Sequence, residues 1–299
     1  MKRPRLAPIL VVCLAPLAAA QEDRMVRVDG RAVHVRTRGH SEATRGWPTV
    51  VFESGAGTGL TTWSAVLEDV STFAAVVAYD RAGIGQSNAD DQPPTPRRMA
   101  RQLRALLAAT DARPPFVLVG HSWGGLLIRM FAAEYPADVT GLVYVDPTDP
   151  RSLEQNIAYL RASGYTDEGA REFLESRREQ VAAFVRSRSG PYRAEMEVIQ
   201  AAETSHFAEF RELPPLKGMP VSILVSNRLH PDVWQGRPCE PAVCHDQWMR
   251  QRVRALTLLG PQGPETEITL TDLSGHEIQR EQPSLVVSAI RRVVAARPR

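Results

Sequence analysis

The stretch VLVGHSWGGLLIRM, residues 117–130, constrains the fold of this chain more than any other. Apolar residues lead into Gly120-His121-Ser122-Trp123-Gly124, and an amphipathic run follows without a loop. A strand pattern that passes directly into a helix pattern needs a sharp turn, and glycines at 120 and 124 remove the side chains that would collide there. The turn exposes Ser122 at the strand end, beside free helix N–H groups that favour developing negative charge.

A serine hydroxyl is a weak nucleophile at neutral pH and needs a base within hydrogen-bond reach. His276, in SGHEIQREQP, lies between the last strand pattern and the final helix pattern, at the same edge of the predicted sheet as Ser122. We therefore expect His276 to be the general base. His121 is expected to point away from the site. The remaining histidines are expected to be structural or surface residues: His34, His40, His206, His230 and His245.

The acid that would orient His276 has two candidates, each after a strand pattern. Asp146 directly ends the pattern over 139–145, one step along from the strand that carries Ser122. Asp232 comes after the pattern over 221–225, behind a proline that directs the chain away. A carboxylate at a strand terminus needs no loop to carry it toward the histidine. The sequence therefore favours Asp146 and keeps Asp232 as the alternative.

Short apolar runs alternate with amphipathic runs along most of the chain. Strand patterns cover 49–52, 75–79, 116–119, 139–145, 221–225 and 266–270, and helix patterns cover 97–109, 126–134, 246–259 and 284–296. Near the start, VRVDGRAVHV alternates around Asp29-Gly30, which is typical of a hairpin. This order predicts an α/β fold: a mostly parallel sheet of the eight-stranded type, an N-terminal antiparallel hairpin, and helices on both faces.

Residues 147–215 interrupt this alternation, because they contain helical patterns, the last over 193–213, and no strand pattern. We expect a helical cap over the sheet, between a first core part at 21–146 and a second at 216–299. A solvated decoration without a role in binding is the alternative. The cap aromatics would form its own core or line a pocket: Phe173, Phe184, Tyr192, Phe207 and Phe210.

Residues 1–20 have the features of an export signal: a basic start, an apolar run over 6–17 and an Ala-x-Ala site that predicts cleavage near Ala20. We expect a secreted or periplasmic protein without a stable membrane anchor, since the apolar run is shorter than the ~20 residues that span a bilayer. The chain has 36 basic and 34 acidic residues, and losing the leader's three basic residues gives a net charge of about −1. With no basic stripe, nucleic-acid binding is not expected.

Two cysteines remain after the leader, Cys239 and Cys244 in RPCEPAVCHDQW. An even pair held in a tight, proline-containing loop of an exported chain predicts a disulfide. The alternative is a metal site with His230 and His245, but the spacing matches no usual zinc arrangement. The oligomeric state is not predicted.

The order of the strands and three stretches together resemble the α/β-hydrolase superfamily, from about residue 26 to the C-terminus: VGHSWGG, SGHEIQREQP and YDRAGIGQS. The loop FESGAGTG, residues 52–59, contains Ala56. The resemblance implies that the backbone N–H groups of Ala56 and Trp123 form an oxyanion hole. FESGAGTG departs from the common pattern, with Ser54 where a histidine usually precedes the glycine and with Glu53 beside it. YDRAGIGQS lacks the lysine of a phosphate loop and is interpreted as a structural turn near the pocket.

The nucleophile type narrows the reaction that the resemblance implies. Family members that dehalogenate or open epoxides use aspartate at this turn, whereas serine with histidine implies acyl transfer through an acyl-enzyme, with water as the final acceptor. We expect a hydrolase of small or medium carboxylic esters, acting on a small-molecule ester or amide without a cofactor. Two alternatives stay open. One is a non-catalytic binding protein on the same scaffold. The other is an iminopeptidase-like enzyme that holds an amino group with cap acids: Glu172, Glu179, Glu195, Glu197, Glu203 and Glu209.

Overall fold

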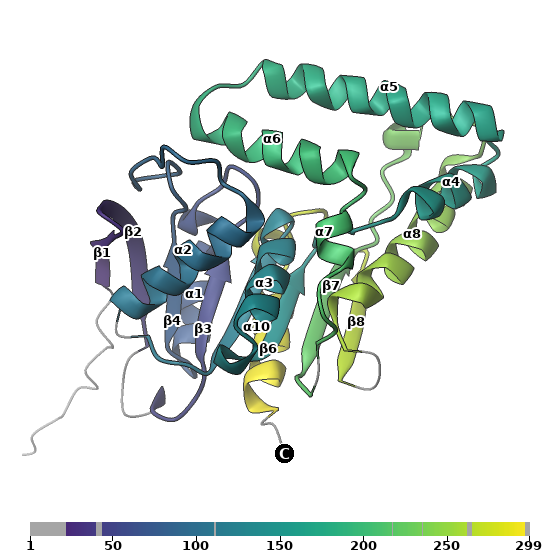
Figure 1. Ribbon diagram of the computed structural model, residues 1–299. Helices are drawn as coiled ribbons and strands as arrows, with labels where there is room; N and C mark the ends of the chain where they lie inside the picture. Colours follow the sequence, from purple (N-terminus) through teal and green to yellow (C-terminus); the bar gives the residue numbers. More distant parts are fainter. Residues whose placement is uncertain are drawn as a thin grey trace, which may run out of the picture.

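Figure 1 shows the computed structural model, which describes residues 22–39, 44–110, 112–216, 218–234, 236–261 and 265–296. The predicted export signal at residues 1–20 lies outside these described residues. Across the described part of the chain, no helix combines the length and apolar character needed to cross a membrane.

The centre of the molecule is an eight-stranded sheet with the strand order β1-β2-β4-β3-β5-β6-β7-β8. β1 and β2 form an antiparallel hairpin, β2 pairs antiparallel with β4, and all further neighbours run parallel. The predicted α/β architecture is confirmed. The strands are β1 (Glu22–Val28), β2 (Arg31–Arg38), β3 (Thr49–Glu53), β4 (Val76–Tyr79), β5 (Phe116–His121), β6 (Val139–Val145), β7 (Val221–Ser226) and β8 (Thr266–Thr271).

Helices cover both faces of the sheet, because alternate residues of the central strands point to opposite sides. Leu118 and Tyr144 face one hydrophobic core, which α2 (Pro96–Ala109), α3 (Trp123–Glu134) and α8 (Pro241–Leu256) complete. Val119 and Val143 face the other core, which α1 (Ser64–Ser71) and α10 (Pro283–Ala295) complete. A short helix, α9 (Ile278–Glu281), precedes α10.

The segment between β6 and β7, residues 147–215, holds four helices and is called the cap from here on. They are α4 (Leu153–Ala162), α5 (Asp167–Arg186), α6 (Gly190–Thr204) and α7 (Ala208–Arg211). Figure 1 shows α5 lying along α6, above one end of the sheet. The single helical run expected over 193–213 is divided, because His206 and Phe207 adopt positive φ angles of 51° and 55° between α6 and α7.

Helix α3 begins at Trp123, three residues before the expected helix start at position 126. Two glycines occupy its first turn, and glycine has low helix propensity, so the hydrophobic pattern starts late. Close packing excludes larger residues there: a Cβ on Gly124 would lie 2.4 Å from the carbonyl oxygen of Glu53, and one on Gly125 would lie 2.7 Å from Cβ of Pro147.

Candidate active site

Ser122 lies at the turn between β5 and α3 with φ 53° and ψ −120°, a conformation that costs a non-glycine residue about 1–3 kcal/mol. Its N–H donates to the carbonyl of Val145 at 3.1 Å, which ties the turn to the neighbouring strand β6. A Cβ at Gly120 would lie 2.5 Å from the carbonyl oxygen of Gly124. The glycines therefore permit the close approach that presents Ser122 at the strand end.

His276 and Asp146 come together at the same end of the sheet, although 130 residues separate them. His276 follows β8, and Asp146 follows β6 directly with a positive φ of 43°. Nδ1 of His276 lies 2.6 Å from Oδ2 of Asp146. The His276 side chain is about half exposed, whereas that of Asp146 is buried. The contact leaves Nε2 as the ring nitrogen available for chemistry.

Asp146 is held by three further contacts, two through its carboxylate and one through its backbone. Its Oδ1 accepts a hydrogen bond from the N–H of Ser226 at 2.7 Å and lies 3.1 Å from Nη2 of Arg252. Its own N–H donates to Leu224 at 2.8 Å. Burial alone would raise the pKa of Asp146, but the contact with His276 and the charge of Arg252 lower it below its ordinary value. Asp146 is therefore ionised at neutral pH.

The other candidate acid, Asp232, belongs to a short 3-10 helix, Pro231–Trp234, after β7. Its side chain lies outside the described residues. The observed partner of His276 is thus the carboxylate that directly ends β6.

His121 packs behind His276, which corrects the expectation that it points away from the site. The two rings lie 4.6 Å apart between centroids, and Nε2 of His121 lies 3.0 Å from the carbonyl oxygen of His276. A carbonyl only accepts, so this nitrogen carries the proton. His121 is 2% exposed, and burial, with the nearby charge of His276, lowers its pKa to about 4. A neutral His121 thus anchors the loop that carries His276.

Ala56 and Trp123 lie on either side of the turn, on the loop after β3 and at the first residue of α3. Among the described residues, no acceptor is bonded to either backbone N–H. A Cβ at Gly55, next to Ala56, would lie 3.5 Å from Cβ of Ser122, so this loop runs against the nucleophile turn. Both N–H groups are thus close to Ser122 and available to an oxygen atom.

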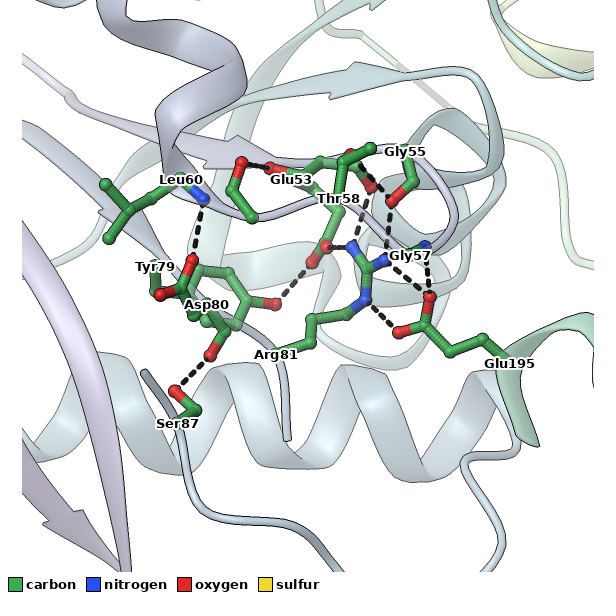
Figure 2. A network of polar contacts seen from close by, with 12 residues as sticks. Glu53, Gly55, Gly57, Thr58, Leu60, Tyr79, Asp80, Arg81, Ser87 and Glu195 are labelled. Carbon is green, nitrogen blue, oxygen red and sulfur yellow. Dashed lines mark hydrogen bonds and ion pairs between the residues drawn. The ribbon is translucent and has the colours of Figure 1, made fainter. Parts of the chain in front are cut away.

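A buried charge network supports the Ala56 loop from below (Figure 2). Nη1 of Arg81 donates to Glu53 and to the carbonyl of Ser54, both at 2.7 Å, and Nη2 donates to the carbonyl of Gly55 at 2.6 Å. Tyr79 donates to the other carboxylate oxygen of Glu53. Burial raises the pKa of Glu53, while the charge of Arg81 opposes that shift. The unexpected glutamate at the end of β3 is therefore the partner of an arginine that holds the loop.

Glu195 connects this network to cap helix α6. Its carboxylate accepts from Nε and Nη2 of Arg81 at 2.7 and 2.8 Å, and it also accepts from the N–H of Gly57 at 2.8 Å. Burial would lower the pKa of Arg81, but the ion pair with Glu195 raises it above its ordinary value. Figure 2 shows the carboxylate reaching from the cap into the core. One cap side chain thus fixes both Arg81 and the loop that carries Ala56.

The turn YDRAGIGQS wraps around the carboxylate of Asp80, as its interpretation as a structural turn implies. Asp80 accepts from the N–H groups of Leu60 at 2.8 Å and Gln86 at 3.0 Å, and lies 2.7 Å from Nδ1 of His34. A Cβ at Gly85 would lie 2.1 Å from its Oδ2. Because the turn is tight, the chain leaves β4 with Arg81 directed toward the site.

A cavity of about 620 Å³ opens beside His276 and Asp146 and extends between the cap and α8. Ser122 is not among the residues that line it. The cavity therefore borders the candidate site at His276 and Asp146. Of the five cap aromatics named from the sequence, Phe173 and Phe207 line it, and Tyr159 of α4 lines it as well. The others lie elsewhere: Phe184 is 40% exposed, Tyr192 lies over Gly57, and Phe210 packs on Trp123.

The cap acids are distributed over different environments. Glu203 lines the cavity, and Glu195 belongs to the buried network. Glu172 and Glu179 are exposed on α5. Glu197 pairs with Arg193 and Glu209 with Arg97, in each case on the surface.

Cys239 and Cys244 form the expected disulfide, which ties the loop before α8 to its first turn. Neither sulfur is therefore a free thiolate beside His230 and His245. Among the described residues, donor atoms of His121, His276 and Glu277 lie within 4.8 Å of one another, an arrangement that a metal ion could use. Both rings already have hydrogen-bond partners, so the cluster fits a positioning role better.

Sequence reasoning did not identify Arg81, Arg252 or Ser226 as site residues. One signal was available: Glu53 ends a strand and follows three apolar residues, and Arg81 comes two residues after the neighbouring strand β4. Two charges at adjacent strand ends must pair if both are buried.

Comparisons with known proteins agree with this geometry. The model of the "Alpha/beta hydrolase family" matches residues 50–289. "Uncharacterized protein YqjL" of Bacillus subtilis (strain 168) is 33% identical over 131 residues, 44% of this chain and 50% of that protein. The chain spans at most about half the length of the first curated relatives it matches.

Two solved structures show the same fold. "Epoxide hydrolase CorEH without ligand" matches with a TM-score of 0.60 and 16% identity, over 92% of this chain and 99% of that one. A "putative aryl esterase from Burkholderia cenocepacia" matches with a TM-score of 0.57 and 22% identity, over 92% of this chain and 100% of that one. The family model matches most of the chain, and the two solved structures have the same fold. The chain belongs to the alpha/beta hydrolase family.

Proposed function

We propose that this protein is a serine hydrolase that cleaves small or medium carboxylic esters through an acyl-enzyme intermediate. Ser122 is the nucleophile, His276 the general base, Asp146 the orienting acid, and the N–H groups of Ala56 and Trp123 form the oxyanion hole. The observation that carries the proposal is the 2.6 Å contact between Nδ1 of His276 and Oδ2 of Asp146. The backbone of His276 is in turn hydrogen-bonded to His121, the residue before Ser122.

In the proposed reaction, Nε2 of His276 takes the hydroxyl proton of Ser122 as Oγ attacks the ester carbonyl carbon. The carbonyl oxygen becomes an oxyanion that accepts the two N–H groups, and His276 returns the proton to the departing alkoxide. Water then attacks the acyl-enzyme, giving one proton to His276, which passes it to Oγ of Ser122 as the acid leaves. The ionised Asp146 fixes the tautomer and stabilises the imidazolium.

Two observations support an ester substrate over the alternatives. The nucleophile position holds serine, which transfers acyl groups, and a solved structure of the same fold is titled a putative aryl esterase. An iminopeptidase would place acids around the substrate's amino group. Of the six cap glutamates named above, Glu203 alone lines the cavity, where the arginines outnumber the acids.

We also propose that the protein is exported, with residues 1–20 as the signal. The disulfide between Cys239 and Cys244 supports this, because such bonds persist in oxidising compartments. The N-terminal sequence of the protein recovered from the periplasm or medium tests it, and a chain that keeps residues 1–20 in the cytoplasm would contradict export.

The function is tested with p-nitrophenyl esters of increasing acyl length and with a fluorophosphonate probe. We expect hydrolysis and covalent labelling of Ser122, and a loss of several orders of magnitude in kcat for Ser122→Ala. Ser205→Ala, at an exposed cap serine, is the matched control and keeps wild-type rates. A properly folded chain that neither labels nor hydrolyses would be a binding protein. Faster cleavage of a proline arylamide than of any ester would favour the iminopeptidase.

A further inference from the structure

The cavity beside His276 is lined by more positive than negative side chains. Among the described residues, three acids line it: Asp146, Asp149 and Glu203. Six arginines line it as well: Arg151, Arg177, Arg178, Arg228, Arg237 and Arg252. Aromatic rings form much of the remaining wall near α4, α5 and α8.

Four of these arginines are paired with carboxylates: Arg252 with Asp146, Arg228 with Glu281, Arg178 with Glu175 and Arg151 with Asp149. Arg177 has Glu203 within electrostatic range, and the charge of Arg177 opposes the rise in the pKa of Glu203 that burial causes. Among the described residues, Arg237 has no carboxylate partner, and Arg151 keeps buried N–H donors without an acceptor despite its ion pair.

Arg237 lies on the loop before α8, among three aromatic side chains. Its guanidinium is 4.7 Å from the ring centroid of Phe173 and 4.9 Å from that of Trp234, and Nη1 donates to the hydroxyl of Tyr159 at 3.2 Å. No carboxylate of the described residues is bonded to it. The rings hold the guanidinium plane without neutralising its charge.

Arg151 also lies near this tyrosine, with its guanidinium 5.8 Å from the ring centroid of Tyr159. Its Nε is 3.1 Å from Asp149, but Nε and Nη1 are buried without a hydrogen-bond acceptor among the described residues. Buried guanidinium donors without acceptors are costly unless a ligand satisfies them. Arg151 and Arg237 therefore both lie beside Tyr159 in the wall of the cavity.

We propose that Arg237 and Arg151 bind a negatively charged oxygen group of the substrate, a carboxylate or a phosphate, while its ester bond reacts at Ser122. This inference rests on the proposed function and names its substrate class: esters with an anionic group at the end remote from the scissile bond. The cavity that contains the two arginines also contains His276, so one molecule can reach both ends. Guanidinium groups match such oxygens through paired N–H donors, and orientation by the rings lowers the entropy cost of binding.

The test compares mono-p-nitrophenyl adipate, which has a free carboxylate, with methyl p-nitrophenyl adipate, its neutral ester of the same length. We expect kcat/KM at least tenfold higher for the anionic ester, mainly through KM, with the preference decreasing as salt is added. Arg237→Gln lowers the ratio of kcat/KM for the anionic ester to that for the neutral ester about tenfold. Where this variant does not fold, Arg151→Gln replaces it in the test. Arg171→Gln, at an exposed α5 arginine outside the cavity, keeps the wild-type ratio.

Calorimetric titration of the Ser122→Ala variant with monomethyl adipate tests the anion site without turnover. Saturable binding that is lost in the Ser122→Ala, Arg237→Gln double variant supports the site, even if the chain hydrolyses no ester and the proposed function fails. Binding of dimethyl adipate as tight as that of the monoester overturns the site, even if ester hydrolysis is found. Displacement of the monoester by inorganic phosphate supports a phosphate-bearing substrate, and resistance to phosphate supports a carboxylate.

Discussion

Arg81 and Glu195 form a bidentate ion pair that joins the sheet to the cap, with N···O distances of 2.7 and 2.8 Å and both side chains at most 5% exposed. The same carboxylate accepts the N–H of Gly57, beside the proposed oxyanion donor Ala56. A displacement of α6 would therefore remove the support of the Ala56 loop. Glu195 therefore couples the position of the cap to the geometry around Ser122.

Glu195→Ala should destabilise the protein and slow ester hydrolysis. The variant leaves Arg81 buried with Glu53 as its remaining carboxylate, and breaking a buried pair costs about 3–5 kcal/mol. The free Gly57 N–H and the relaxed Ala56 loop should lower kcat as well. Urea unfolding and initial rates on a p-nitrophenyl ester measure both effects.

The matched control is Glu197→Ala, two residues along the same helix. Glu197 forms an exposed i,i+4 pair with Arg193, which contributes roughly 0.5 kcal/mol or less. Glu195→Gln should lie between the two, because the amide oxygen still accepts one hydrogen bond. Equal losses of stability for the alanine variants at 195 and 197 would show that the buried ion pair stabilises the protein no more than the exposed one.

Asp146→Asn should cut kcat by roughly 10⁴ at neutral pH, because an amide that donates to His276 favours the wrong tautomer. Asp232→Asn is the comparison and should change kcat little. Circular dichroism on both variants checks the fold, since Asp146 also lies beside Arg252. A large loss for Asp232→Asn with a small one for Asp146→Asn would transfer the role of the acid to Asp232.

Reducing the disulfide between Cys239 and Cys244 should lower the unfolding free energy by at most about 2 kcal/mol, because the closed loop is short. Thermal unfolding with and without dithiothreitol measures the loss. The double variant Cys239→Ser, Cys244→Ser should unfold at the temperature of the reduced protein and not respond to the reductant. Two titratable thiols in the protein as isolated from an oxidising compartment would contradict the bond.

The sheet and the contact between His276 and Asp146 could be predicted because each depends on local sequence. Strand and helix periods are read within a dozen residues, and the turn at Ser122 needs its glycines at fixed positions. Asp146 and His276 follow directly after strands whose ends meet at one edge. Once the strands are assigned, the topology alone brings these residues together.

The supporting contacts could not be predicted, because they join segments that no local pattern connects. Arg81 and Glu195 are 114 residues apart, and their pairing depends on how α6 lies over the sheet. The charge of the cavity likewise depends on which cap arginines face inward. Arg237 lies in a loop whose sequence indicates only the disulfide, and its neighbours Phe173 and Tyr159 come from two other helices.

Acid should destabilise the protein through His121. Burial, aided by the charge of His276, lowers the pKa of His121 in the folded protein to about 4 from an ordinary value of 6.5. Between these values the unfolded chain binds a proton that the folded protein does not. The contribution of His121 to the free energy of unfolding is therefore complete above about pH 6.5. It declines by about 1.4 kcal/mol per pH unit as the pH falls toward 4.

Urea unfolding at pH 7 and pH 4.5 measures this effect against His121→Gln, which does not titrate and whose amide can still donate to the carbonyl of His276. Carboxylates elsewhere titrate equally in both proteins, so their contribution cancels in the comparison. The wild type should lose about 2 kcal/mol more than the variant over this range. The same loss in both proteins would contradict the lowered pKa, because His121 would then be protonated as easily in the folded state as in the unfolded chain.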